Sequence, residues 1–303
     1  MIAGRQLAMM SVFSKPMLRG VALAVGLLTG CSTVREPDYD TLIAHRGESF
    51  DAPENTMPAY RMAVDRGFGF ECDIYLSTDG RCYTFHDVDL ARTTGGANTN
   101  RCCDVDWKMV EKLNVAGWGQ WKGSKYDPTR PALLEEVLAL ARPGRKIYVE
   151  IKTGPEIVPF VKKVMEREAK ATPDTVLFIS FNAESCRALK RDLPAYKVYL
   201  LDGGRPWTCN PETNEWEPGL PYAAEELIAR VRACGADGID LCFIPEVHDC
   251  AFVKAFHDAG LEFHVWTIDD PAFAAEAFRR GAETVTTNRA KYILDSLGPT
   301  RKD

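Results

Sequence analysis

Short runs rich in β-branched and aromatic residues alternate along the chain with stretches whose apolar residues recur every three or four positions. The runs predict strands, and the longer stretches predict amphipathic helices. The eight predicted strands span residues 41–45, 69–75, 146–152, 176–181, 197–201, 238–242, 262–267 and 283–287. The predicted helices include residues 58–66, 133–141, 157–171, 183–191, 223–234, 247–259 and 271–280. Strands separated by helices pair in parallel, so eight such units predict an α/β fold of the (β/α)8 TIM-barrel type, with a doubly wound open sheet as the alternative.

Two connections, residues 87–130 and 202–222, are longer than a barrel requires. Both follow a strand-like run, so in a barrel both would lie at the C-terminal face, where the active sites of this fold are built. We therefore expect residues 41–303 to form one barrel domain with a small insertion at about residues 87–130, after the second strand region.

Composition and charge exclude several classes of protein. The chain has 303 residues, of which 46% are hydrophobic and 26% charged, so it has enough apolar material for a large core and is neither disordered nor collagen-like. The formal net charge of −6 argues against a general role in binding nucleic acid.

Residues 1–30 have the features of a secretion signal: three positive charges and no acid, followed by an apolar run at residues 21–28. That run is shorter than the roughly 20 residues that a transmembrane helix needs. The following Leu28-Thr29-Gly30-Cys31 resembles the lipobox of bacterial lipoproteins. We expect residues 1–30 to be a lipoprotein signal peptide, Cys31 to carry the lipid, and residues 31–40 to be a linker. The lipid would anchor the protein in the bacterial cell envelope, at the outer membrane because Ser32 and not Asp follows the cysteine; an ordinary secretory signal is the alternative.

Acidic residues occur inside two of the predicted strands. Glu71 and Asp73 are two positions apart and therefore project to the same side of their strand, as do Glu150 and Lys152 in the next barrel strand. Charged groups inside a barrel are costly unless they are paired or bind a metal. Glu71, Asp73 and Glu150 are thus candidate ligands of one divalent cation, Mg²⁺ or Ca²⁺, and the alternative is a buried ion-pair network with Lys152 and Arg46.

Two histidines, His45 and His86, each follow an apolar strand-like run near these carboxylates in sequence. Two imidazoles on either side of a metal-bound group form a natural general acid and base pair. The neighbouring Arg46 suits a phosphate oxygen, and Lys152 is either a second phosphate ligand or a counterion of the carboxylates.

The ordered set of motifs resembles the glycerophosphodiester phosphodiesterase family. The motifs are His45-Arg46-Gly47, Pro53-Glu54-Asn55-Thr56, Glu71-x-Asp73, Thr78-Asp79-Gly80, His86-Asp87 with Leu90-x-Arg92-Thr93-Thr94-x-Gly96, and Glu150-Ile151-Lys152. The resemblance implies a TIM barrel with a small insertion that hydrolyses a small-molecule glycerophosphodiester to glycerol 3-phosphate and an alcohol. It also implies a divalent metal held by Glu71, Asp73 and Glu150, with His45 and His86 as acid and base.

The chain departs from the family pattern at its last strand. The family often has Thr-x-Asp-x-Pro there, whereas this chain has Thr286-Thr287-Asn288-Arg289-Ala290, without the carboxylate and the proline. Three other functions stay open: a related barrel phospholipase of the sphingomyelinase D or phosphatidylinositol-specific type, a non-catalytic lipoprotein that binds anions, and, least favoured, a barrel enzyme acting on sugars.

Tryptophans and the remaining histidines suggest further contacts. Trp118, Trp121, Trp207 and Trp216 lie in the two long connections, where they would either bind a choline-type ammonium or pack the loops. Trp266 shares a strand face with His264 and is a candidate substrate contact. We expect His248 and His257, on a predicted helix, to lie at the surface.

The sequence contains ten cysteines, and lipidation of Cys31 would leave nine thiols. Because an envelope protein can form disulfides, we expect Cys102 or Cys103 to pair with Cys209, and Cys242 to pair with Cys250.

Overall fold

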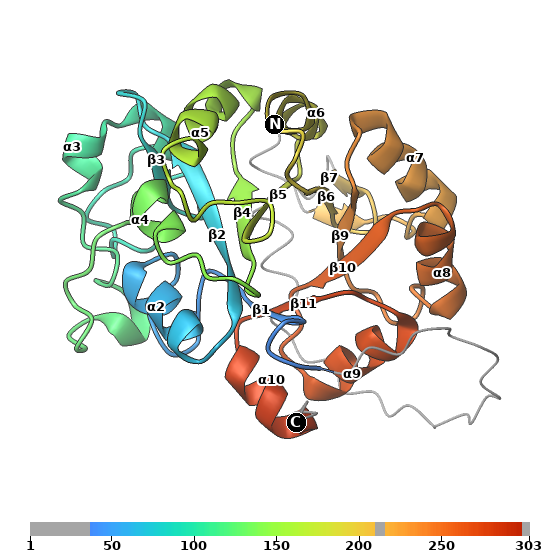
Figure 1. Cartoon of the computed structure of the whole chain (residues 1–303). Coiled ribbons are helices and arrows are strands. Elements are labelled where there is room, and N and C mark those ends of the chain that lie inside the picture. Colours follow the sequence, from blue (N-terminus) through green and yellow to red (C-terminus); the bar gives the residue numbers. More distant parts are fainter. Residues whose placement is uncertain (1–36, 210–215, 299–303) are drawn as a thin grey trace.

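The computed structural model of the chain describes residues 37–209 and 216–298, and within these ranges eight parallel strands form a closed barrel (Figure 1). Around the barrel the strand order is β1, β11, β10, β9, β6, β5, β4 and β2, and β1 pairs with β2 to close the ring. The strands are β1 (Leu42–Ala44), β2 (Gly69–Leu76), β4 (Ile147–Ile151), β5 (Val176–Ser180), β6 (Val198–Asp202), β9 (Gly238–Cys242), β10 (Glu262–Trp266) and β11 (Val285–Thr287). The predicted TIM barrel is confirmed, and the open sheet is excluded.

Helices surround the strands and cover the outside of the barrel (Figure 1). They are α2 (Met57–Asp65), α4 (Leu134–Leu138), α5 (Val158–Met165), α6 (Ala183–Asp192), α7 (Ala224–Cys234), α8 (Cys250–Asp258), α9 (Pro271–Arg280) and α10 (Ala290–Leu297). Each of the predicted helices is present. However, α4, α5 and α8 are shorter than predicted, and α10 was not predicted.

The alternation of side chains along the strands separates two apolar regions. Cys72 and the other outward-facing residues pack in the large core beneath the helices. The inward-facing Ile43, Tyr148, Ile179 and Tyr199 belong to a smaller cluster inside the barrel. Because successive side chains of a strand point to opposite faces, Glu71 and Asp73, the two neighbours of the outward-facing Cys72, point into the barrel.

The connection between β2 and β4 forms a small subdomain with a core of its own. It begins with β3 (Cys82–Thr84), which pairs antiparallel with β2, and continues through the helix α3 (Trp107–Val110). Its core residues are Tyr75, Tyr83, Phe85, Leu90, Cys102, Val105, Trp107, Val110 and Val115. The other long connection contains the hairpin β7 (Trp207–Cys209) and β8 (Trp216–Pro218).

Two disulfide expectations are wrong. Cys102 and Cys103 both carry free thiols, and the Cys102 thiol points inward to the carbonyl oxygen of Asp87 at 3.2 Å. Cys242 and Cys250 also carry free thiols, the former buried beside the barrel.

The expectation of a surface position for His248 is also wrong. This residue precedes α8, is completely buried, and its Nδ1 accepts a hydrogen bond from the backbone N–H of Ile244 at 3.1 Å. Its ring packs against Phe252 at 4.6 Å between centroids, so it belongs to the packed region between β9 and α8.

The predicted signal peptide at residues 1–30 and the predicted lipidation site Cys31 lie outside the described residues. In residues 37–209 and 216–298, no helix has both the length and the apolar character needed to cross a bilayer.

Candidate active site

Three carboxylates meet at the C-terminal end of the barrel. Glu71 and Asp73 come from β2 and Glu150 from β4, where Asp73 and Glu150 are direct partners in the parallel register. One oxygen from each of the three lies within 4.8 Å of the others, and all three residues are buried. The structure therefore brings together the three residues that the sequence predicted as metal ligands.

The electrostatics of this triad favour a bound cation. Burial and the neighbouring carboxylates raise the pKa of Glu71 well above its usual range and that of Glu150 to about 7. The Oε1 atom of Glu71 is buried, yet it accepts no hydrogen bond from any residue that the structure describes. A divalent cation would supply the missing partner and the opposite charge that three buried carboxylates require.

Lys152 and Arg46 also pair with the triad. The Nζ of Lys152 lies 2.8 Å from Glu150 Oε1 and 3.2 Å from Asp73 Oδ1, and the Nε of Arg46 lies 3.5 Å from Asp73 Oδ2. These ion pairs hold the pKa of Asp73 below its usual range despite burial. Asp73 is therefore ionised and ready to bind a cation at neutral pH.

The loop after β1 has an unusual backbone. Arg46 has φ of 57°, a left-handed conformation that a non-glycine residue rarely adopts, and Gly47 follows at 78°. A Cβ at Gly47 would lie 2.6 Å from the backbone of Ala59, which explains the glycine of the His-Arg-Gly motif. The strained turn brings the Arg46 N–H to Glu71 Oε2 at 2.8 Å and its guanidinium into the site.

Asn55 orients Asp73. Its φ is 56°, and its Nδ2 donates to Asp73 Oδ2 at 2.7 Å while its Oδ1 accepts from the backbone N–H of Asp73. The Tyr60 hydroxyl donates to the same Oδ1 at 2.8 Å. The Pro-Glu-Asn-Thr motif therefore fixes one carboxylate of the triad, a role that the sequence alone did not assign.

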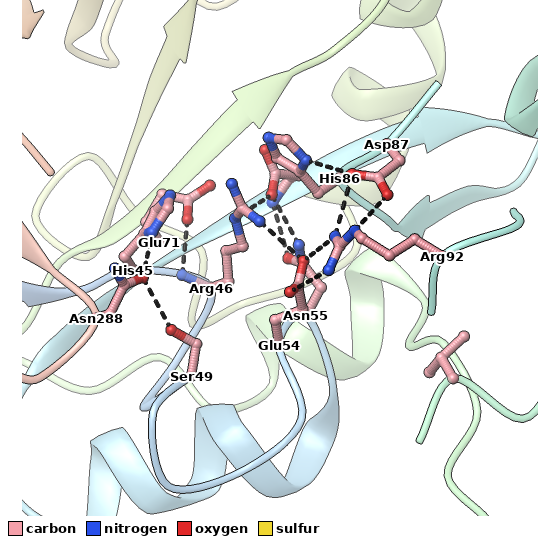
Figure 2. A network of polar contacts seen from close by, with 12 residues as sticks. His45, Arg46, Ser49, Glu54, Asn55, Glu71, His86, Asp87, Arg92 and Asn288 are labelled. Carbon is pink, nitrogen blue, oxygen red and sulfur yellow. Dashed lines mark hydrogen bonds and ion pairs between the residues drawn. The ribbon is translucent and has the colours of Figure 1, made fainter. Parts of the chain in front are cut away.

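His45 and His86 lie on either side of the Arg46 side chain (Figure 2). Nδ1 of His45 is 2.7 Å from Asn288 Oδ1, and Nδ1 of His86 is 2.8 Å from Asp87 Oδ1. Both partners are acceptors, so both Nδ1 atoms carry the proton and both Nε2 atoms hold a lone pair. Burial and the charge of Arg46 lower the pKa of His45 to about 3 and that of His86 to about 4.

Arg92 binds both the carboxylate that pairs with Arg46 and the carboxylate that pairs with His86 (Figure 2). Its guanidinium donates to both oxygens of Glu54, at 2.8 and 2.7 Å, and to both oxygens of Asp87, at 2.6 and 3.1 Å. Glu54 in turn accepts from Arg46 at 2.8 Å, and Asp87 is the partner of His86. The guanidinium of Arg92 also stacks on Trp118, 4.8 Å from its ring centroid. Arg92 occurs in a motif, but only the three-dimensional arrangement reveals this bridging role.

Replacing Arg92 with alanine should lower kcat/KM about 10- to 100-fold, because Asp87 and Glu54 would lose the bidentate donor that holds them. Steady-state kinetics of purified Arg92→Ala and Arg92→Lys test this, and lysine should retain only part of the activity. Arg130→Ala is the matched control, since Arg130 also binds a carboxylate (Glu136) through two nitrogens and lies over a tryptophan. Equal activity of the Arg92 and Arg130 variants would contradict the bridging role.

His45 and His86 make the free energy of unfolding depend on pH. Their pKa values in the folded protein lie below the ordinary 6.5, so below pH 6.5 the unfolded chain takes up protons that the folded chain does not. The histidine contribution to stability should therefore fall as the pH drops from about 6.5 to 4, and His86 should account for about 3 kcal/mol of that fall. Urea unfolding of His86→Ala in the presence of a chelator should show a flatter dependence in this window.

His248 provides the matched control for that experiment. Burial lowers its pKa to about 4, although it lies outside the ion-pair network. His248→Gln should flatten the same pH window without reducing turnover. A slope in His86→Ala identical to that of the unchanged protein would contradict the assignment.

A cavity of about 360 Å³ opens beside the triad. It is lined by Arg46, Ser49, Phe50, Glu54, Trp118, Gln120, Trp121, Asp269 and Asn288. Neither histidine and none of the three carboxylates lines the cavity, but Arg46 and Asn288 do, and these two residues contact Asp73 and His45 respectively. The volume lies in the range of small-molecule sites.

The predicted tryptophans divide into three groups. Trp118 and Trp121 line the cavity, whereas on the β7–β8 hairpin Trp207 pairs with Pro218 and Trp216 pairs with Cys209. Trp266 packs against the interior cluster of the barrel, and its indole N–H donates to the carbonyl oxygen of Asp240 at 3.0 Å. His264 is buried inside the barrel, where its ring stacks on Tyr199 and Nδ1 contacts Thr284 Oγ1 at 2.7 Å.

The chain is similar to a known protein family, to individual proteins in sequence, and to solved structures in fold. Residues 45–291 match the model of the glycerophosphoryl diester phosphodiesterase family. A glycerophosphodiester phosphodiesterase of Caldanaerobacter subterraneus subsp. tengcongensis is 27% identical over 84% of this chain and 96% of its own length. Glycerophosphodiester phosphodiesterase 1 of Mus musculus is 31% identical over 60% of this chain and 54% of its own length. A phosphodiesterase of Oleispira antarctica, solved with the product sn-glycerol-3-phosphate, has a similar fold, with a TM-score of 0.70, 24% identity, and coverage of 85% of this chain and 96% of its own.

Proposed function

The chain belongs to the glycerophosphoryl diester phosphodiesterase family and is a hydrolase of glycerophosphodiesters, and from this premise we propose how its own residues carry out the reaction. The products are glycerol 3-phosphate and an alcohol. The observation that carries the proposal is the joint presence of a buried carboxylate triad and two histidines whose Nδ1 atoms both donate to fixed acceptors.

One divalent cation, Mg²⁺ or Ca²⁺, would be held by Glu71, Asp73 and Glu150. Five carboxylates (Glu54, Glu71, Asp73, Asp87 and Glu150) face three cationic side chains (Arg46, Arg92 and Lys152) in the site. With all five ionised, as a bound cation would favour, the excess of two negative charges equals the charge of such an ion. When bound, the cation neutralises the phosphodiester and polarises its phosphorus. Arg46 and Lys152 add positive charge at the growing negative charge of the phosphoryl oxygens.

We assign the general base to His45 and the general acid to His86. A base must begin neutral, and the neutral amide of Asn288 does not favour protonation of His45 as a carboxylate would. The free site keeps His86 neutral, so it would have to take up a proton before it acts as the acid; the Asp87 carboxylate would stabilise that imidazolium, and a bound anionic phosphodiester would add to the effect. His45 takes the proton of the nucleophile, either water or the 2-hydroxyl of glycerol, as the new P–O bond forms. Attack by the 2-hydroxyl would give a cyclic phosphate first, and water would then open this ring to give glycerol 3-phosphate. His86 gives its proton to the alcohol oxygen as the old P–O bond breaks.

The cavity would receive the organic part of the substrate beside the phosphate. Trp118 and Trp121 offer aromatic walls for an ammonium group such as choline. Trp266 does not line this cavity, so a contact from Trp266 would be made from the end of β10. A comparable turnover of glycerophosphocholine and glycerophosphoglycerol would argue against selection of the ammonium.

An assay with a panel of substrates tests the proposed reaction. The full chain, depleted of metal and then supplied with Mg²⁺ or Ca²⁺, is incubated with glycerophosphocholine, glycerophosphoethanolamine, glycerophosphoglycerol and intact phosphatidylcholine. We expect metal-dependent release of glycerol 3-phosphate from the glycerophosphodiesters. Release of phosphocholine, or hydrolysis of the intact lipid alone, would overturn the proposal and favour a phospholipase.

Attachment to the envelope is part of the proposal and rests on Leu28-Thr29-Gly30-Cys31. Labelling with a fatty acid in bacterial cells should modify the unchanged chain and not Cys31→Ala. Equal labelling of both chains would refute the lipid anchor.

A further inference from the structure

Asn288 occupies the place where the family pattern often has an aspartate, and it contacts the proposed base. Its Oδ1 lies 2.7 Å from His45 Nδ1 and also accepts a hydrogen bond from Ser49 Oγ at 3.1 Å (Figure 2). An amide has a donor end and an acceptor end, and only the acceptor end keeps the proton on Nδ1 of His45. If the amide were reversed, His45 would need the other tautomer, with the proton on Nε2, and could not act as a base.

The orientation of this amide is fixed from the neighbouring strand. Asp269 follows β10, and its Oδ2 accepts from Asn288 Nδ2 at 2.7 Å. Its Oδ1 accepts from the backbone N–H of Asn288 at 2.8 Å and from Thr287 Oγ1 at 2.9 Å. A carboxylate has no donor, so it binds only the NH₂ end of the Asn288 side chain and leaves the oxygen for His45.

We propose that Asp269 is a positioning residue that fixes the reactive tautomer of His45 through Asn288. Position 288 carries a neutral amide, and the carboxylate that hydrogen-bonds to this amide belongs to Asp269, on the loop after β10. Asp269 neither takes up a proton nor contacts the reacting atoms in this scheme. The catalytic consequence rests on the proposed function, because it requires His45 to be the base.

The two positions allow a reciprocal exchange as the test. Asp269→Asn allows the amide of Asn288 to reverse, and Asn288→Asp places two carboxylates against each other at the 2.7 Å contact. In the double variant, the carboxylate introduced at position 288 would accept from His45 directly, and the amide introduced at position 269 would donate to that carboxylate. We expect each single variant to lose at least about 10-fold in kcat with little change in KM, and the double variant to recover most of the loss.

Asp270→Asn is the matched control. Asp270 is the next residue, but it caps α9 by accepting from the N–H groups of Ala272 and Phe273, and asparagine caps a helix equally well. This variant should retain the kcat of the unchanged protein. If Asp269→Asn keeps its kcat within about twofold, or if the double variant is no better than either single variant, the proposal is wrong.

A spectroscopic readout separates this proposal from the proposed function. Nitrogen NMR of histidine-labelled protein should show His45 with a protonated Nδ1 in the unchanged chain and in the double variant, and a shift toward protonated Nε2 in Asp269→Asn. This result is independent of turnover, so a protein that releases no glycerol 3-phosphate would refute the function but not the positioning. Should Asp269→Asn not fold, the kcat of Asn288→Asp is compared with that of the double variant. A double variant no faster than Asn288→Asp would then contradict the positioning role of Asp269. An unaltered His45 tautomer in a folded Asp269→Asn variant would overturn the proposal.

Discussion

His86→Ala should hydrolyse glycerophosphocholine at least about 100-fold more slowly than the unchanged protein, yet lose much less on a glycerophosphodiester with a nitrophenol leaving group. The reason is the pairing of His86 with Asp87 at 2.8 Å, which suits a group that protonates the departing oxygen. Choline leaves as a strongly basic alkoxide and needs that proton, whereas nitrophenolate is stable without it. His45→Ala should be equally impaired with both substrates, because the base acts on the nucleophile in either case.

Steady-state and single-turnover kinetics of the two variants on both substrates would measure this difference. The opposite pattern, with His45→Ala rescued by the better leaving group, would exchange the two roles. Near-normal turnover of either variant would remove that histidine from the mechanism altogether.

Glu71→Gln should abolish metal-dependent turnover and at the same time increase the stability of the metal-free protein. Three carboxylates, all buried, lie with oxygens within 4.8 Å of one another, so removing one charge relieves repulsion when no cation is present. In the unchanged protein, a cation at 100 times its Kd should raise the free energy of unfolding by about 2.7 kcal/mol. The variant should lose most of that gain.

Thermal unfolding with Mg²⁺, with Ca²⁺ and with a chelator would measure both effects. Glu48→Gln is the matched control, since Glu48 is also a buried carboxylate whose pKa burial raises to about 7, but it pairs with Arg66 outside the triad. That control should keep the full metal-dependent gain. The triad would be a structural ion-pair network, and not a metal site, if the unchanged protein gained no stability from either ion.

The contacts around His45 mark the limit of what the sequence could reveal. The alternation in Glu71-x-Asp73 and Glu150-x-Lys152 placed four charged groups inside the barrel, and the structure confirms their convergence. By contrast, the partner of His45 is 243 positions away in the chain, directly after the last strand. No local pattern encodes such a pairing, and the motif that might have indicated it carries an asparagine where the family often has an aspartate.

Two further predictions were wrong, the surface position of His248 and the disulfides. His248 was assigned to a helix that in fact begins at Cys250, and a shift of three residues moved it from the expected surface into the core. The pairing of Cys102 or Cys103 with Cys209 was expected because both long connections lie at one face of the barrel, but the Cys102 thiol turns into the core of the insertion. Sharing a face does not bring two sulfur atoms within the short distance that a disulfide requires.

The sequence by itself determined the barrel and the order of its strands and helices, and it predicted that Glu71, Asp73 and Glu150 converge and that His45 and His86 belong to the site. These features follow from periodicities of two and 3.6 residues and from motifs that occupy a few consecutive positions. Only the tertiary structure determined that Arg92 bridges Glu54 and Asp87, that Asn55 orients Asp73, and that Asp269 holds Asn288 against His45. These roles depend on hydrogen bonds between side chains that closure of the barrel brings together from distant strands, and the direction of a hydrogen bond is a property of three-dimensional geometry that residue spacing does not contain.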